Sequence, residues 1–210
     1  MQQHYAAIDA KIKLLNLKSA LSTAELSQRP SRPPDPAAEN FALIALAEKL
    51  AASPAGILQT LADTALTLCR AHSAGLSLLE KIDRQQNFHW RAIAGRWAEH
   101  LNGGTPRDFG PCGTVLDLNV PLLFSHPERD FPYFGDVSPL LEEAVLVPFY
   151  IKGEAVGTIW VVLHDHSRRF DREDLRVLTA HSQRQRIKQF WHLTKPNKLL
   201  PSSRPLTMPS

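Results

Sequence analysis

The sequence predicts an α+β domain in which helices cover a central antiparallel sheet. Apolar residues occupy both alternating sets of positions from Val145 to Ile151 and again from Ala155 to His164, as in strands covered on both faces. Lys152-Gly153-Glu154 between them is short enough for a tight turn, so the two strands pair antiparallel. Helical patterns lie on either side, in residues 39–69 and 170–178. Because so apolar a hairpin is not stable alone, we expect the other segments to cover it.

Composition limits the class of protein. The 210 residues are 43% hydrophobic and 21% charged, which suits one globular domain with non-globular ends. A net charge of +3 gives no reason to expect a nucleic-acid partner. No apolar run reaches the ~20 residues of a membrane span, and the N-terminus lacks the apolar centre of a signal peptide. Only Cys69 and Cys112 are present, which fits a reducing cytoplasm.

Three regions follow from the patterning. Residues 1–38 are expected to be a tail and an extended proline-rich linker, because the prolines after Arg29 cannot continue a helix. Residues 39–180 are expected to form the domain. Residues 181–210 are polar and then proline-rich, and we expect a tail without a core there.

The first half of the domain reads as two helices followed by two strands. Residues 39–50 have an apolar stripe, and Ser53-Pro54 is a typical start for the second helix, whose buried face ends at Cys69. Residues 74–82 and 88–94 alternate as strands do.

The second half contains a long irregular segment, residues 105–138. A short helix is expected after Pro111 and a short strand at 121–125, and a loop of this length in a compact domain is usually functional or disordered. Folded against one face of the sheet, it is where we expect a pocket. The last helix begins with Asp171 as its N-cap, and its apolar pattern stops at His181.

Two motifs give a family resemblance. The hairpin AVLVPFYIKGEAVGTIWVVLHD, with Gly153, Gly157 and Thr158 in a G-x-x-x-G-T-I core, and the later FDREDLRVL resemble the GAF domain family of small-molecule sensors. More narrowly, FHWRAIAGRWA, TPRDFGPCGTVLD and PLLFSHPERDFPYF are similar to the GAF segment at the front of bacterial sensor histidine kinases, over about Arg29 to Ala180.

The resemblance implies a fold and a function. It implies an antiparallel sheet of about six strands, with helices on one side and a pocket between sheet and loop on the other. It also implies a non-catalytic sensor that binds a small molecule and signals to a partner protein or, through its flanking helices, to a second copy.

The chain departs from the kinase pattern after Ala180. No phosphoacceptor-histidine helix and no glycine-rich nucleotide-binding segment follows, so we expect no kinase activity. This part of the sequence is typical of a truncation or a different reading frame, and an inert kinase remnant is one alternative function.

Six residues are candidates for contacting a ligand, on the strands and in the long segment: Trp90, Arg107, Cys112, Tyr133, Phe149 and Trp160. Large aromatic residues also fill cores, so each of them has both interpretations. Arg107 could pair with an anionic group of a ligand, although such an arginine more often forms an ion pair at the protein surface.

Cys112 has three interpretations. Where GAF domains attach a bilin, the cysteine is commonly followed by histidine, whereas Gly113 follows here, so a covalent bilin is not expected. A thiol-based redox activity is the alternative from the enzyme class, and it needs a thiol pKa below the usual ~8.5. A small apolar residue facing the pocket is the interpretation we favour. The cofactor stays unknown, and the histidines predict no metal site.

Overall fold

The computed structural model describes residues 20–53, 56–82, 85–151 and 153–183. Within this part of the chain, a six-stranded sheet has the order β3-β2-β1-β6-β5-β4, with all neighbours antiparallel. Its strands are β1 (Ser73–Ile82), β2 (Gln85–Gly95), β3 (Gly104–Pro106), β4 (Leu122–Ser125), β5 (Glu143–Ile151) and β6 (Glu154–Leu163). The predicted α+β architecture is confirmed, and β3 is a strand that the glycine-rich sequence did not predict.

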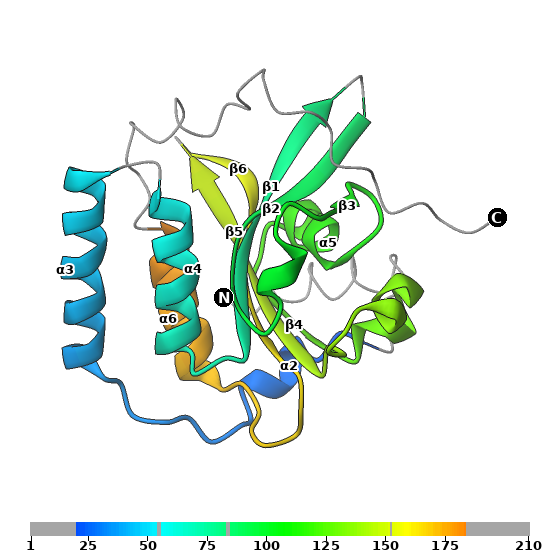
Figure 1. Ribbon diagram of the computed structural model, residues 1–210. Coiled ribbons are helices and arrows are strands. Elements are labelled where there is room, and N and C mark those ends of the chain that lie inside the picture. Colours follow the sequence, from blue (N-terminus) through cyan, green and yellow to red (C-terminus); the bar gives the residue numbers. More distant parts are fainter. Residues whose placement is uncertain (1–19, 54–55, 83–84, 152, 184–210) are drawn as a thin grey trace.

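Helices cover one face of this sheet and irregular segments cover the other (Figure 1). The α-helices are α2 (Thr23–Leu26), α3 (Pro36–Ala52), α4 (Ile57–Leu68), α5 (Pro111–Leu118) and α6 (Arg172–Gln183). Short 3-10 helices are η2 (Ala98–His100), η3 (Pro127–Arg129) and η4 (Pro132–Asp136). α4 and α6 lie against the sheet with α3 outside them, and α5 packs on the opposite face.

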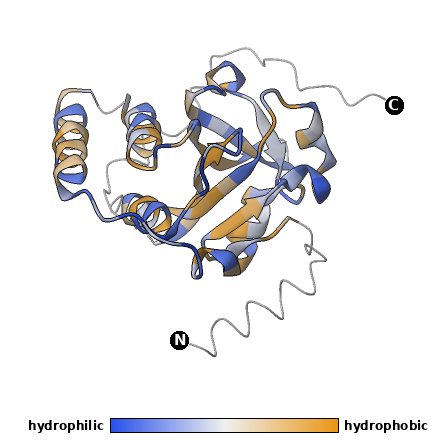
Figure 2. Cartoon of the chain, turned by 90° about the horizontal axis from the view of Figure 1, so that it is seen from below, coloured by the Kyte–Doolittle hydropathy of each residue, from blue (hydrophilic) through white to orange (hydrophobic). Residues whose placement is uncertain are grey.

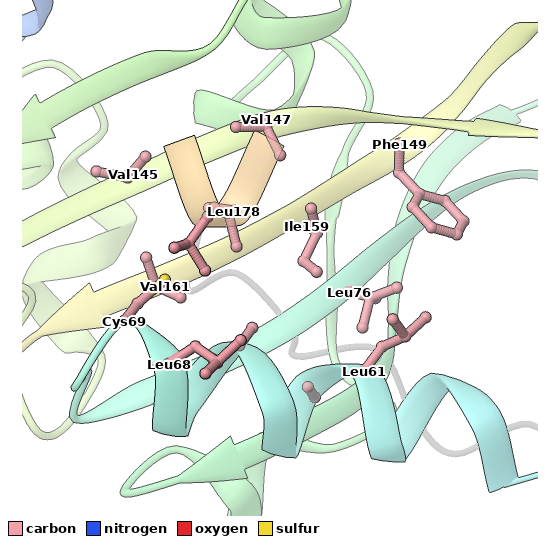
Figure 3. Packing of buried hydrophobic residues seen from close by; sticks show 14 of the residues in the cluster. Leu61, Leu68, Cys69, Leu76, Val145, Val147, Phe149, Ile159, Val161 and Leu178 are labelled. Atoms are coloured by element: carbon pink, nitrogen blue, oxygen red, sulfur yellow. The ribbon is translucent and has the colours of Figure 1, made fainter. Parts of the chain in front are cut away.

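The sheet therefore separates two cores. The helix-side core joins α4 and α6 to the strands, and Figure 3 shows Leu61, Leu68 and Leu178 facing Leu76, Val145, Val147, Phe149, Ile159 and Val161. The loop-side core lies on the other face and contains Phe88, Trp90, Trp97, Phe124, Leu146, Trp160 and Val162. Two filled faces explain why β5 and β6 are apolar at almost every position.

A β-bulge decides which side chains of the hairpin share a face. Near the turn Tyr150 pairs with Ala155, but Phe149 pairs with Gly157, so β6 contains one extra residue. Beyond the bulge Trp160 lies opposite Leu146 rather than Val145. Because paired residues point to the same face, Trp160 enters the loop-side core while Phe149 enters the helix-side core.

The segment before α3, residues 20–35, packs on the domain, and we call it the N-terminal strap. Leu21 forms a β-bridge with Phe124 at the β4 edge, and Ala20 and Leu26 are buried. The sequence predicts an extended linker here, and the segment contains the short helix α2. It gave no sign of the packing.

Two arginines, each directly before a proline, fix the strap. Arg29 donates to both carboxylate oxygens of Glu143, at 3.1 and 2.8 Å. Arg32 donates to Asp174 at 2.9 Å, and both carboxylates are almost fully buried. Buried ion pairs of this kind hold the strap against β5 and the start of α6.

α6 begins as predicted and ends later. Asp171 accepts hydrogen bonds from the backbone N–H groups of Glu173 and Asp174, at 2.7 and 3.0 Å, which is an N-cap. The apolar pattern predicts an end near Ala180, but the helix continues to Gln183 because His181 and Ser182 are buried polar residues. The expected tail from residue 184 on lies outside the described residues.

α3 has an apolar surface that the domain leaves uncovered. None of its residues is buried, and Phe41 and Ile44 are 76% and 57% exposed. Figure 2 shows this helix at the left edge, coloured largely as hydrophobic, apart from the strands at the middle of the molecule.

Candidate functional site

A small cavity lies in the loop-side core, between the sheet and the segment that the sequence singled out. Its volume is about 30 Å³. Twelve residues line it: Trp90, Trp97, Thr105, Pro111, Cys112, Tyr133, Phe134, Leu141, Ala144, Leu146, Trp160 and Val162. We call it the aromatic cavity. Since a cavity of about 150 Å³ is needed to hold benzene, the aromatic cavity is closed to organic molecules in this conformation.

Aromatic rings pack closely around the aromatic cavity. Trp97 stacks between Trp90 and Phe134, with ring centroids 6.2 and 6.3 Å away. Trp160 meets Trp97 edge to face at 5.9 Å, and Tyr133 lies 4.3 Å from Phe134. Such contacts add stabilisation beyond burial, so the closed state has a favourable energy of its own.

The strand residues under Trp160 fit its ring. Gly75 of β1 pairs with Trp160, and a Cβ atom at this glycine would come within 2.4 Å of the indole. The indole N–H donates to the Ser77 hydroxyl at 2.9 Å. A small residue and a hydroxyl at alternate positions of one strand therefore fix the ring that forms the floor of the cavity.

Ring N–H groups hold residues 138–140, which lie within the segment that closes the cavity, residues 132–141. Trp97 Nε1 donates to the Pro139 carbonyl at 2.9 Å, and His100 Nε2 donates to the Ser138 carbonyl at 3.0 Å. His164 Nδ1 donates to the Leu140 carbonyl at 2.8 Å. Because a carbonyl oxygen can only accept, the ring nitrogen that faces it must carry the hydrogen, and this is Nε2 in His100 and Nδ1 in His164.

His164, directly after β6, makes a second hydrogen bond through its other ring nitrogen. Its Nε2 accepts from the Ser73 hydroxyl at 2.7 Å, and that hydroxyl accepts from the backbone N–H of Trp97 at 3.0 Å. Burial lowers the pKa of His164, so the imidazole is neutral as the two hydrogen bonds require. The serine is fully buried, which makes this pair structural rather than nucleophilic.

Tyr133 carries a buried polar atom without a partner. Its Oη has no partner in hydrogen-bonding geometry among the described residues, although the Thr105 side chain is near enough to oppose part of the rise in its pKa. Gly110 leaves the space that Oη occupies, because a Cβ atom there would lie 2.7 Å away. Burial raises the pKa of the Tyr133 phenol, so the hydroxyl is neutral. An unpaired buried hydroxyl costs stability, and in a cavity wall it is available to a ligand.

Cys112 lies in the first turn of α5 and faces the same cavity. Its Sγ accepts from the Thr158 hydroxyl at 3.2 Å. Burial raises the pKa of the thiol. A redox nucleophile needs the opposite shift, so the geometry favours the interpretation of Cys112 as a neutral wall residue.

The structure brings four of the six predicted site residues together at the cavity: Trp90, Cys112, Tyr133 and Trp160. Phe149 lies in the helix-side core on the opposite face, because of the bulge between the two strands. Arg107 lies outside the lining with a largely buried side chain, which donates to the Gly113 carbonyl and, at 2.6 Å, to Asp117. Neither residue touches the cavity in this conformation.

Sequence reasoning missed Trp97, which contacts more of the cavity rings than any predicted residue. It follows β2 just before η2, outside any alternating pattern. The available signal was the sequence Gly95-Arg96-Trp97, where a large aromatic residue directly follows a strand-ending glycine.

A second, larger cavity of about 200 Å³ lies between the N-terminal strap and helices α3, α4 and α6. Its walls are charged, but most of these groups already pair with one another. Arg32 binds Asp174, and Arg176 bridges Glu39 and Glu173. We therefore treat it as the joint between strap and helices.

No group of three or more histidine, cysteine or acidic side chains in the described ranges is arranged to hold a metal ion. The described helices also include none that is long and apolar enough to cross a membrane.

Comparisons with known proteins agree with this geometry. The model of the GAF domain family matches residues 51–183. No curated protein sequence matches the chain. Among solved structures, the GAF domain of an Acinetobacter phosphoenolpyruvate-protein phosphotransferase superposes with a TM-score of 0.59 at 13% identity, covering 75% of this chain and 96% of that one.

Two further structures show the same fold. The second GAF domain of DevS from Mycobacterium smegmatis gives a TM-score of 0.51 at 20% identity, over 63% of this chain and 90% of that one. The chromophore binding domain of Stigmatella aurantiaca phytochrome P1 gives 0.53 at 13% identity, over 73% of this chain and 61% of that one. At such identities the likeness concerns the fold alone.

Proposed function

The chain belongs to the GAF domain family, whose members are generally sensory or regulatory ligand-binding domains, and on that premise we propose that it is a non-catalytic sensor that binds a small molecule in the aromatic cavity. The observation that supports this most is the aromatic cavity itself, closed by residues 132–141 under a row of hydrogen bonds.

Ligand binding requires this segment to move. The free volume of about 30 Å³ admits water but no organic molecule. A ligand therefore binds an open state in which Tyr133, Phe134 and Leu141 have shifted away from the sheet. It stabilises that state by its differential affinity for the open over the closed arrangement.

Glu143 provides the route by which the shift reaches the helices. It begins β5 and is separated from the closing segment, residues 132–141, by Glu142 alone. Its buried carboxylate accepts from Arg29 of the strap and from the backbone N–H of Phe170 ahead of α6, at 2.8 and 3.1 Å. Movement of residues 132–142 thus changes the position of a group that holds both the strap and the start of α6.

The receiver of the signal is proposed to be a second copy or a partner protein that contacts α3. This helix follows the strap and exposes Phe41 and Ile44. A role as the input module of a two-component system of the histidine-kinase type, in the cytoplasm of a bacterium, fits the segments that resemble such kinases.

Native mass spectrometry of the intact chain tests the proposal. We expect the purified protein, or the protein incubated with a metabolite panel, to retain a small molecule. Ala144→Leu fills the aromatic cavity and should abolish retention, whereas Ala92→Leu adds the same volume to the helix-side core and should not. A wild-type chain that binds nothing and shows no rise in melting temperature with the panel would overturn it.

A further inference from the structure

The walls of the aromatic cavity carry no charge. None of the lining side chains in the described part of the chain is acidic or basic. Transfer of a carboxylate, phosphate or ammonium group into such a place, without an opposite charge, is strongly unfavourable. The lining therefore discriminates against charged ligands.

Two of the three tryptophan N–H groups at the cavity are already engaged within the protein. Trp160 donates to Ser77 and Trp97 donates to Pro139, both at 2.9 Å. A ligand that takes one of these donors must break an internal hydrogen bond. These rings consequently offer a ligand their apolar surface, which suits stacking against another flat ring.

Tyr133 Oη is a polar atom that a ligand can satisfy at no such cost. It is buried, faces Gly110 and makes no hydrogen bond with the described residues. A phenol hydroxyl both donates and accepts one hydrogen bond readily. Pairing it would remove a penalty that the ligand-free protein carries, so a matched ligand gains affinity there.

Resting on the proposed function, we infer that the aromatic cavity takes an uncharged, flat and mainly apolar molecule, with one hydrogen-bonding group placed against Tyr133 Oη. Stacking on the tryptophan rings supplies most of the affinity, and the single hydroxyl orients the ligand. The competing ligand class is an anion, for which Arg107 would have to leave Asp117 and turn inward.

Three probes with the same ring separate these classes. Benzyl alcohol is neutral, benzoate is an anion and benzylammonium is a cation, and their sizes are nearly equal. Binding to the full chain is measured by calorimetry and by the shift in melting temperature. We expect benzyl alcohol to bind at least about tenfold more tightly than either charged probe, because only it enters without leaving a charge unpaired.

Conservative substitutions test whether the ligand contacts Tyr133 Oη. Tyr133→Phe should weaken benzyl alcohol binding about tenfold while leaving the ligand-free protein equally or more stable. Tyr150→Phe is the matched control, because that hydroxyl donates to Asn119 outside the cavity, at 2.6 Å. Arg107→Gln should leave benzyl alcohol binding unchanged.

Other results would overturn the inference in distinguishable ways. Tighter binding of benzoate that is lost in Arg107→Gln would replace the neutral class by an anionic one and leave the proposed function standing. Unchanged benzyl alcohol binding in Tyr133→Phe would remove the assigned contact. No binding of any probe, together with no response to a metabolite panel, would remove both the ligand class and the proposed function.

Discussion

Trp160 lies directly on Gly75 of the neighbouring strand, so close that a Cβ atom on the glycine would be 2.4 Å from the indole ring. The pairing of these two residues across β1 and β6 places the ring over Gly75. The floor of the aromatic cavity therefore depends on the absence of one methyl group.

Gly75→Ala should lower the free energy of unfolding by about 1–3 kcal/mol, because the added methyl group displaces a packed indole. Urea denaturation measures this change. Gly135→Ala is the matched control, since no atom lies within 4 Å of its Cβ position, and it should change stability by less than about 0.5 kcal/mol. Equal stabilities for the two variants would contradict the tight fit of Trp160.

Glu143→Gln should destabilise the protein by about 3 kcal/mol, because it leaves the Arg29 guanidinium without its buried partner. Hydrogen exchange in this variant should also rise in α6, since Phe170 loses a charged acceptor. The control is Glu25→Gln, which removes the other carboxylate on Arg29; that side chain is 53% exposed, so its loss should cost less than about 0.5 kcal/mol. Similar losses for both would contradict the role of Glu143 in holding the strap and the start of α6.

Acid should destabilise the protein through two histidines whose pKa values burial lowers. Burial lowers the pKa of His72 and of His164 below the usual ~6.5, so the unfolded chain binds protons more readily than the native one. Asp165 opposes this shift in both, while Arg96 adds to it. Stability contributed by the neutral rings is complete above about pH 6.5 and declines as the pH falls below it.

The measurement is the free energy of unfolding at pH 7.5 and pH 5.5. His164→Asn should be less stable than wild type at the higher pH, and its decline between the two should be smaller. A decline of the same size in both proteins would show that His164 does not contribute to the pH dependence.

Cys112 should react slowly with iodoacetamide at pH 8, because burial raises its pKa and shields the sulfur. The same should hold for Cys69, whose pKa burial also raises. Unfolding in urea should expose both thiols and restore ordinary rates. Fast modification of Cys112 alone in the native protein would instead support the thiol-based redox alternative.

The sequence predicted the layers of the fold well, because the spacing of apolar residues shows which faces of a helix or strand are buried. The apolar runs of β5 and β6, the Asp171 cap and the helix after Pro111 are all local signals, and the structure confirms each of them. The site could be predicted only in part. A one-residue bulge near Gly157 separates Phe149 from Trp160, and alternation alone does not reveal a bulge.

Contacts between segments far apart in the chain also could not be predicted from the sequence. Arg29 pairs with a carboxylate 114 residues away, in a segment whose prolines indicate only the lack of a helix. Trp97 gains its importance from Trp90, Phe134 and Trp160, which meet only in the folded chain.

Fluorine NMR of the protein labelled with 5-fluorotryptophan tests most directly whether a ligand occupies the aromatic cavity. Three of the four tryptophans line it, and Trp191→Phe removes the one outside the described residues. On titration with benzyl alcohol, or with a molecule retained in native mass spectra, we expect the signals of Trp90, Trp97 and Trp160 all to shift, and Ala144→Leu to prevent the shifts. A ligand that binds with measurable affinity while leaving these three signals in place would show that the site lies elsewhere.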